Sequence, residues 1–118
     1  MDFKRIKLSE SSTKKLQQFK TRTGLTPNIA CRIALGLSLG QNRMPSLELY
    51  TDESGQEINR YTLLGEHNQI LISLFKQWCY EAKINKEDEY QYFIAHINQG
   101  VELLINRVKG LDSLIQFL

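Results

Sequence analysis

The residues of this chain that could do chemistry are few and scattered. The two histidines, His67 and His96, fit no metal-binding spacing such as His-Glu-x-x-His, so each is expected to be a surface or capping residue. The two cysteines, Cys31 and Cys79, fall inside apolar helical patterns and form no metal or redox motif. We therefore expect two buried free thiols in a reducing compartment and no metal site.

The acidic and glycine clusters have structural explanations. The run Glu87-Asp88-Glu89 is typical of the first turn of a helix, where the helix dipole favours negative charge. Gly36 and Gly40 do not form a phosphate-binding loop, because a close helix contact and a helix end account for them. Since no paired carboxylates or phosphate loop stand in a suitable context, the sequence predicts a protein that is not an enzyme and holds no cofactor.

The distribution of charge is more informative. The net charge is +2, but residues 1–43 carry nine Lys and Arg against two acidic residues, whereas residues 44–118 carry six against eleven. A basic block joined to an acidic body indicates a polyanionic partner, because each cation that neutralises a phosphate releases counterions. The alternative is an ordinary solvated helix face. The candidate DNA-binding residues are Lys4, Arg5, Lys7, Lys14, Lys15, Lys20 and Arg22.

Length and composition suit a single domain. A chain of 118 residues, with 42% hydrophobic and 24% charged residues, can bury one core. We divide it into a basic strand-helix-helix unit over 1–43 and a body over 44–118. No apolar run is long enough to span a membrane and no signal peptide opens the chain, so we expect a cytoplasmic protein.

The first three elements must position the basic residues. Imperfect alternation over 3–8 predicts a short strand or extended arm. Ser9 is a plausible N-cap for the first helix, and Gly24 supplies the left-handed conformation that ends it. Thr26 is the expected N-cap of a second helix, and Pro27 suits the first helical position.

The second helix, expected over 27–39, is apolar on most of its faces. Such a helix is covered on most sides, either by the core of its own domain or by another subunit. We therefore expect the chain to self-associate through this helix and the corner that precedes it. The candidate interface residues are Gly24, Ile29, Ile33 and Leu37.

The remaining residues complete a mainly α fold. Residues 47–50 and 58–62 alternate around a turn-forming segment, which predicts a small β-hairpin. Apolar residues at three- and four-residue spacing predict two long helices, the first over about 66–83 and the second ending at Gly110. Residues 111–118 are expected to form a short apolar segment.

The first third of the chain resembles a ribbon-helix-helix DNA-binding unit. The resemblance is carried by residues 4–10, Leu16, Phe19, residues 23–27 and residues 33–35. It implies a strand that pairs with the strand of a second chain and enters the major groove, with Phe3, Arg5 and Lys7 pointing outward. It also implies that the N-terminus of the second helix holds a phosphate.

Over its whole length the chain resembles the DndE family of the bacterial DNA phosphorothioate modification system. The residues that carry this resemblance are 22–35, RTGLTPNIACRIAL, and 55–66, GQEINRYTLLGE. The resemblance implies a mostly helical homotetramer that binds duplex DNA, favouring nicked DNA, through surface lysines. It also implies a non-catalytic protein that works beside DndC and DndD, while a cysteine desulfurase mobilises the sulfur that replaces a non-bridging phosphate oxygen.

We therefore predict a mainly α-helical, self-associating protein that holds duplex DNA by backbone contacts during phosphorothioation. Two alternatives stay open at this stage. The first is a transcriptional repressor of ribbon-helix-helix type, and the second is a protein-only scaffold that docks on DndC or DndD without touching DNA.

Overall fold

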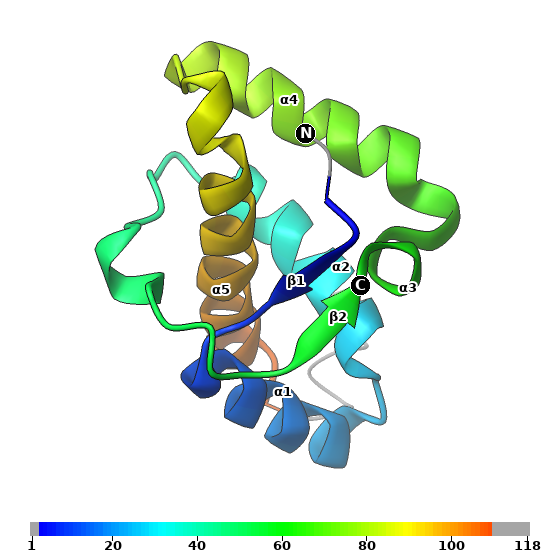
Figure 1. Ribbon diagram of the computed structural model, residues 1–118. Coiled ribbons are helices and arrows are strands. Elements are labelled where there is room, and N and C mark those ends of the chain that lie inside the picture. The colour runs from blue at the N-terminus through cyan, green and yellow to red at the C-terminus, as the bar shows by residue number, and fades with distance from the viewer. Residues whose placement is uncertain (1–2, 110–118) are drawn as a thin grey trace.

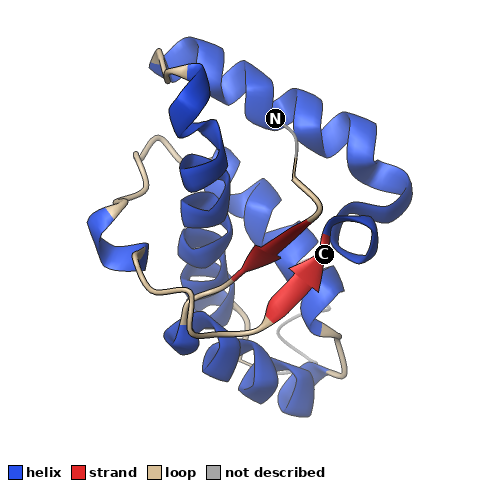
Figure 2. Ribbon diagram, in the orientation of Figure 1, coloured by secondary structure: helices blue, strands red, loops and turns tan. Residues whose placement is uncertain are grey.

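The computed structural model describes residues 3–109, so Gly110 and the predicted apolar segment 111–118 lie outside the described residues. Within residues 3–109, α-helices surround a two-stranded antiparallel sheet in a molecule of 39 × 28 × 28 Å (Figure 2). The predicted mainly α fold is confirmed. None of the helices in this part of the chain has both the length and the apolar character needed to cross a membrane.

Helix α1 (Glu10–Thr23) begins and ends where the sequence predicts. The Ser9 hydroxyl oxygen accepts a hydrogen bond from the backbone N–H of Ser12 at 3.1 Å, which is the geometry of an N-cap. Gly24 follows the helix with a φ of 83°, and its N–H donates to the carbonyl oxygen of Lys20. Glycine adopts this left-handed conformation without steric cost, so the corner between the first two helices is encoded locally.

Helix α2 (Pro27–Leu39) also has the predicted bounds. Thr26 has the extended backbone of an N-cap residue, but its hydroxyl donates to Asn28 Oδ1 at 2.6 Å and caps no backbone N–H. Thr26 is therefore the N-cap residue, as predicted, but its side chain caps no N–H because the Asn28 side chain competes for the hydroxyl.

The core is centred on the packing of α2 along α5 (Glu89–Arg107), which lie side by side in Figure 1. Gly100 permits this close approach, since a Cβ atom there would stand 1.9 Å from the carbonyl oxygen of Ala34. Phe93 and Ile97 of α5 are fully buried. The apolar character of α2 is thus explained largely, though not wholly, by the core of its own chain.

The sheet differs from the predicted hairpin. Strand β1 (Arg5–Lys7) pairs with β2 (Glu57–Asn59), with Ile6 opposite Ile58. These two isoleucines are buried, and burying them together selects a pairing between distant segments that local alternation cannot reveal. The predicted hairpin between 47–50 and 58–62 is therefore wrong.

The segments assigned to that hairpin form helical turns instead. The 3-10 turn η1 (Glu48–Tyr50) occupies the first, and the short helix α3 (Arg60–Leu64) follows β2 directly. The Asn59 side chain accepts a hydrogen bond from the N–H of Tyr61 at 2.7 Å, so this asparagine caps α3.

The second half of the chain contains both predicted long helices. A 3-10 turn, η2 (Gly65–His67), leads into α4 (Asn68–Ala82), and another, η3 (Lys86–Asp88), leads into α5. Helix α4 lies across one end of the molecule and α1 lies at the other, with the sheet between them (Figure 1).

Candidate nucleic-acid interface

All seven candidate DNA-binding residues lie at the surface, with Lys15 half-buried and the other six exposed. They form two groups. The strand cations precede or occupy β1, and they are Lys4, Arg5 and Lys7. The residues on α1 are Lys14, Lys15, Lys20 and Arg22.

Helix periodicity separates the four cations of α1. Lys14, Lys15 and Arg22 fall within about 100° of arc at 3.6 residues per turn, and we call these three the helix cations. Lys20 falls on the opposite flank of the helix, so the fold does not bring it together with the others. A shallow groove of about 470 Å³ runs beside two of the helix cations, and it is lined by Glu10, Ser11, Lys14, Lys15 and Gln18.

Two of the cations have carboxylate partners. Arg5 Nε lies 3.3 Å from Glu57 Oε1, and Lys14 Nζ lies 3.3 Å from Glu10 Oε1. Both pairs are exposed to solvent, so each contributes little stability and can be exchanged for a phosphate. Lys7 stands opposite Glu57 in the sheet register, which reduces the local positive charge at the strand.

Arg32, another member of the basic block, has a structural role. Its Nε donates to the carbonyl oxygen of Leu63 at 2.6 Å, and its Nη2 donates to that of Thr62 at 3.0 Å. These carbonyls belong to the last residues of α3, where helix carbonyls lack intrahelical donors. Arg32 therefore joins α2 to α3. Unlike the helix cations, it uses its guanidinium to hold backbone carbonyls of its own chain.

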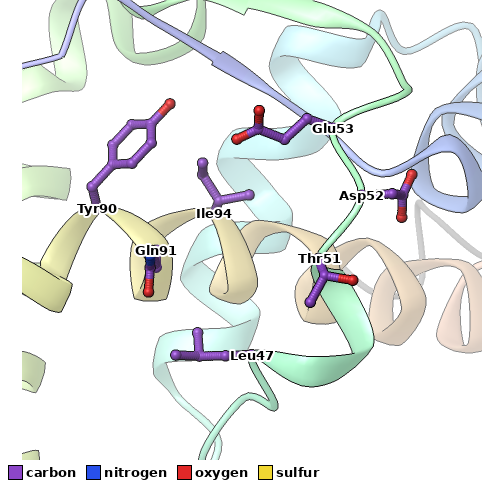
Figure 3. A pocket seen from close by; sticks show the side chains of 7 residues that line it. All are labelled: Leu47, Thr51, Asp52, Glu53, Tyr90, Gln91 and Ile94. Atoms are coloured by element: carbon purple, nitrogen blue, oxygen red, sulfur yellow. The ribbon is translucent and has the colours of Figure 1, made fainter.

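The acidic part of the molecule has a pocket of its own. This pocket has a volume of about 250 Å³ and lies where the segment after η1 passes α5 (Figure 3). The residues that line it are Leu47, Thr51, Asp52, Glu53, Tyr90, Gln91 and Ile94. Burial, and to a lesser extent the Glu53 carboxylate, raises the pKa of Tyr90. Two carboxylates at its edge oppose the approach of DNA phosphates.

The two histidines have different surroundings. His67 is exposed, as predicted, but His96 is fully buried, so its prediction as a surface or capping residue is wrong. His96 Nδ1 lies 2.7 Å from Ser38 Oγ, which also accepts a hydrogen bond from Gln99 Nε2 at 2.9 Å. Its ring packs edge-to-face against Trp78, with 4.1 Å between centroids. Burial lowers the pKa of His96 to about 4, so the imidazole is neutral at pH 7.

The two cysteines are buried and free, as predicted. Burial raises the pKa of the Cys31 thiol to about 12 and that of the Cys79 thiol to about 11. Because the thiolate is the nucleophilic form, this burial disfavours nucleophilic reaction of both cysteines at neutral pH.

A cleft beside α3 contains residues that the sequence patterns do not single out. It has a volume of about 520 Å³ and is lined by Phe3, Lys4, Asn59, Arg60, Tyr61, Gly65 and Asn68. Phe3, predicted to point outward, is only 8% exposed and supports the guanidinium of Arg60, which lies 4.6 Å from the ring centroid. The prediction for Phe3 is wrong because the residue lies before β1, where strand alternation no longer applies. Sequence analysis does not identify Arg60 and Tyr61 as candidate site residues, because the segment that contains them alternates like a strand.

The predicted interface residues lie on the outer side of α2 and at the corner before it. Gly24 and Ile29 are exposed, and Ile33 and Leu37 are half-buried. Helix α4 extends this surface with two exposed apolar side chains that sequence analysis did not select, Ile70 and Leu74, 61% and 52% exposed. A groove of about 330 Å³ separates the two helices, and it is lined by Ile29, Arg32, Ile33, His67, Ile70 and Leu71.

Comparison with known proteins identifies the family. The family model described as DNA sulphur modification protein DndE matches residues 5–111, which is most of the chain. The chain belongs to the DndE family. No curated protein sequence matches it.

Solved structures of DndE proteins share this fold. The crystal structure of DndE from Escherichia coli B7A, described as involved in DNA phosphorothioation modification, is 27% identical and has a TM-score of 0.74. The alignment covers 88% of this chain and 98% of that one. A DndE variant in which two glycines are replaced by lysine, described as involved in DNA phosphorothioation, is 25% identical with a TM-score of 0.71. There the alignment covers 88% of this chain and 99% of the variant.

Family membership gives the surface cations a context. The DndE family takes part in DNA phosphorothioation, a modification of the phosphate backbone itself. A surface rich in exposed cations and a partner rich in phosphate are complementary in charge.

Proposed function

We propose that this DndE-family protein is a non-catalytic, DNA-binding component of the phosphorothioation machinery that acts in the cytoplasm. It holds duplex DNA by contacts to the phosphate backbone and favours nicked DNA. The observation that carries the proposal is the group of helix cations, which lie at the surface on one side of α1 in a member of a DNA-modification family.

The chemistry of these side chains suits binding without sequence selection. Lys and Arg contacts to phosphate fix the position of a protein on DNA but do not read bases. The groups that a catalyst could use are poorly placed for reaction, because both thiols and His96 are buried with pKa values that keep them neutral at pH 7. The role we propose is therefore to hold DNA while DndC and DndD act on it.

Self-association is part of the proposal. The α2–α4 face, which we define by Ile29, Ile33, Ile70 and Leu74, is apolar and partly exposed in a single chain. A second copy that covers this face removes apolar surface from water, and a homotetramer presents several sets of helix cations to one DNA molecule.

The two alternatives are supported unequally. A ribbon-helix-helix repressor needs its first strand to pair with that of another chain, but one edge of β1 is paired with β2 of the same chain. The buried Phe3 also removes one of the three outward positions. The scaffold alternative has an observation in its favour, the acidic pocket around Asp52 and Glu53, which is complementary to a basic side chain of DndC or DndD.

A salt titration of DNA binding tests the proposal. Affinities are measured for intact and nicked duplexes of one sequence, with wild type, with the double variant Lys14→Gln/Lys15→Gln, and with a control, Lys83→Gln/Lys86→Gln. The control removes the same charge from exposed positions at the turn between α4 and α5. The Lys14/Lys15 variant is expected to weaken binding to both duplexes and to lower the salt slope by about 0.9 for each phosphate that is no longer neutralised.

Each outcome has a definite meaning. Equal losses in the two double variants would assign the effect to net charge rather than to the helix cations. Wild-type protein that binds neither duplex at low salt would overturn DNA binding and favour the scaffold.

A further inference from the structure

Glu10 is a carboxylate that lies within the proposed DNA-binding surface. It precedes Lys14 by one helical turn, and its Oε1 is 3.3 Å from Lys14 Nζ. At 3.6 residues per turn the two side chains are about 40° apart around α1, and both line the groove beside this helix. A carboxylate and a phosphate bind an ammonium group through the same kind of charged oxygen. The Glu10 carboxylate therefore occupies a position beside Lys14 that a DNA phosphate can also use.

The helical turn that carries Glu10 is held in place by the segment before β2. The Glu10 N–H donates a hydrogen bond to Asp52 Oδ2 at 2.8 Å. One turn along the same helix, the Thr13 hydroxyl oxygen accepts a hydrogen bond from the N–H of Gln56 at 2.7 Å. Because these contacts fix the start of α1, the Glu10 side chain stays within reach of Lys14 and competes with phosphate from within the same molecule.

The competition affects one of the three helix cations. None of the ion pairs among the described residues involves Lys15 or Arg22. The side chains of Lys14 and Glu10 are 70% and 63% exposed, so their pair is screened by water and contributes little stability. A phosphate can therefore replace the carboxylate, but it does so against a partner that is already in place.

We propose that Glu10 sets the DNA affinity of the helix cations by competing with phosphate for Lys14. The inference rests on the proposed DNA binding and adds to it a residue that weakens the contact. In the free protein the carboxylate pairs with Lys14, and on DNA it releases Lys14 to a phosphate and faces solvent. Because part of the binding free energy is used to break this pair, stable binding requires several cations to meet phosphates together.

A double-mutant cycle tests this competition. Affinity for one intact duplex at a single low salt concentration is measured for wild type, Glu10→Gln, Lys14→Gln and the double variant Glu10→Gln/Lys14→Gln. Glutamine keeps the shape of the glutamate side chain and removes its charge. The control is Glu87→Gln, which removes the same charge from an exposed position in η3 that does not line the groove.

We expect Glu10→Gln to bind the duplex about twofold to fivefold more tightly than wild type, as the loss of an exposed ion pair allows. Lys14→Gln should bind more weakly than wild type. Once Lys14 is replaced, Glu10→Gln should change the affinity by less than about 1.5-fold, because no pair is left to break. Glu87→Gln should bind as wild type. Circular dichroism confirms that each variant is folded.

Three results would overturn the inference. If Glu10→Gln tightens binding equally with and without Lys14, or fails to tighten it in the wild-type background, Glu10 does not act by competing for Lys14. If Lys14→Gln binds as wild type, Lys14 is not a phosphate contact. In both cases the proposed function survives. If wild type does not bind the duplex, DNA binding itself fails and the role of Glu10 fails with it.

Discussion

The buried surroundings of His96 determine its protonation state. It is fully buried, with Ser38 on its Nδ1 side and the Trp78 ring against its plane. Its Nε2 has no hydrogen-bond partner among the described residues, so a second ring proton would be an unsatisfied buried charge. The neutral imidazole is therefore the form that the fold accepts.

This arrangement predicts a pH-dependent loss of stability. The unfolded chain takes up a proton on this histidine near pH 6.5, whereas the folded chain resists until about pH 4 because burial lowers the pKa of His96. Between those values the unfolded state binds more protons, so the free energy of unfolding falls as the pH falls. At 1.36 kcal/mol per pKa unit the full loss is about 3 kcal/mol.

Urea unfolding of wild type and His96→Gln at pH 7 and pH 4 measures this contribution. The variant cannot titrate at this position, so its stability should fall by about 3 kcal/mol less than that of wild type over the interval. His67→Gln, which makes the same substitution at the exposed histidine, is the control for the replacement itself. Parallel profiles for wild type and His96→Gln would show that His96 is accommodated in its charged form.

At the scale of elements, the parts that the sequence predicts are those with local signals. The end of α1 follows from Gly24 and the start of α2 follows from Pro27. A left-handed residue ends a helix, and a proline favours the first helical position, within one or two residues of where it stands. The cores of α4 and α5 follow from apolar periodicity. These signals need no knowledge of distant residues.

The sheet and the cleft could not be predicted in this way. The pairing of Ile6 with Ile58 depends on burial against the same core, which no local window contains. Arg60 and Tyr61 alternate like strand residues, but they form a helix that Asn59 caps, and they line the same cleft as Lys4. The charge of the basic block is evident from composition. That Lys20 lies apart from the helix cations becomes clear only when the four residues are placed around helix α1.

The contact between α2 and α5 gives an element-scale prediction. Gly100→Ala places a methyl group where the backbone of Ala34 stands, and a backbone cannot move aside as a flexible side chain can. We expect the two helices to separate locally and the free energy of unfolding to fall by about 3 kcal/mol.

Urea unfolding compares this variant with Asn106→Ala, an exposed substitution on the same helix, which should change stability by less than about 0.5 kcal/mol. If Gly100→Ala is as stable as Asn106→Ala, α2 and α5 are packed less closely than described.

At the scale of the whole molecule, charge and apolar surface are distributed over different regions. The helix cations lie on α1, the acidic pocket lies beside α5, and the α2–α4 face is apolar. A single chain offers few cations to the phosphates of DNA, and an assembly that buries the apolar face multiplies them. Oligomeric state and DNA affinity should therefore change together.

Gly24 offers a way to test this coupling without disturbing the chain's own packing. A Cβ atom at this position would meet no atom within 4 Å, so a lysine side chain starts into open space in the single chain. Its φ of 83° disfavours a lysine by roughly 1 kcal/mol, which the protomer can tolerate. Only a second copy packed on the corner is strongly affected by the added charge. We predict that Gly24→Lys lowers the mass measured by light scattering and weakens DNA binding, while circular dichroism shows intact helices.

The control for this variant is Gly24→Asn, because asparagine adopts the left-handed conformation more readily and adds no charge. It should keep the wild-type mass and affinity.

A second variant, Ile70→Lys, places a charge on the α4 part of the apolar face and is expected to lower the mass in the same way. If Gly24→Lys is folded and keeps the wild-type mass while Ile70→Lys does not, the subunits meet on α4 and the corner lies outside their interface. If neither variant changes the mass, the apolar α2–α4 face is not what joins the subunits, and the coupling between assembly and DNA binding loses its structural basis.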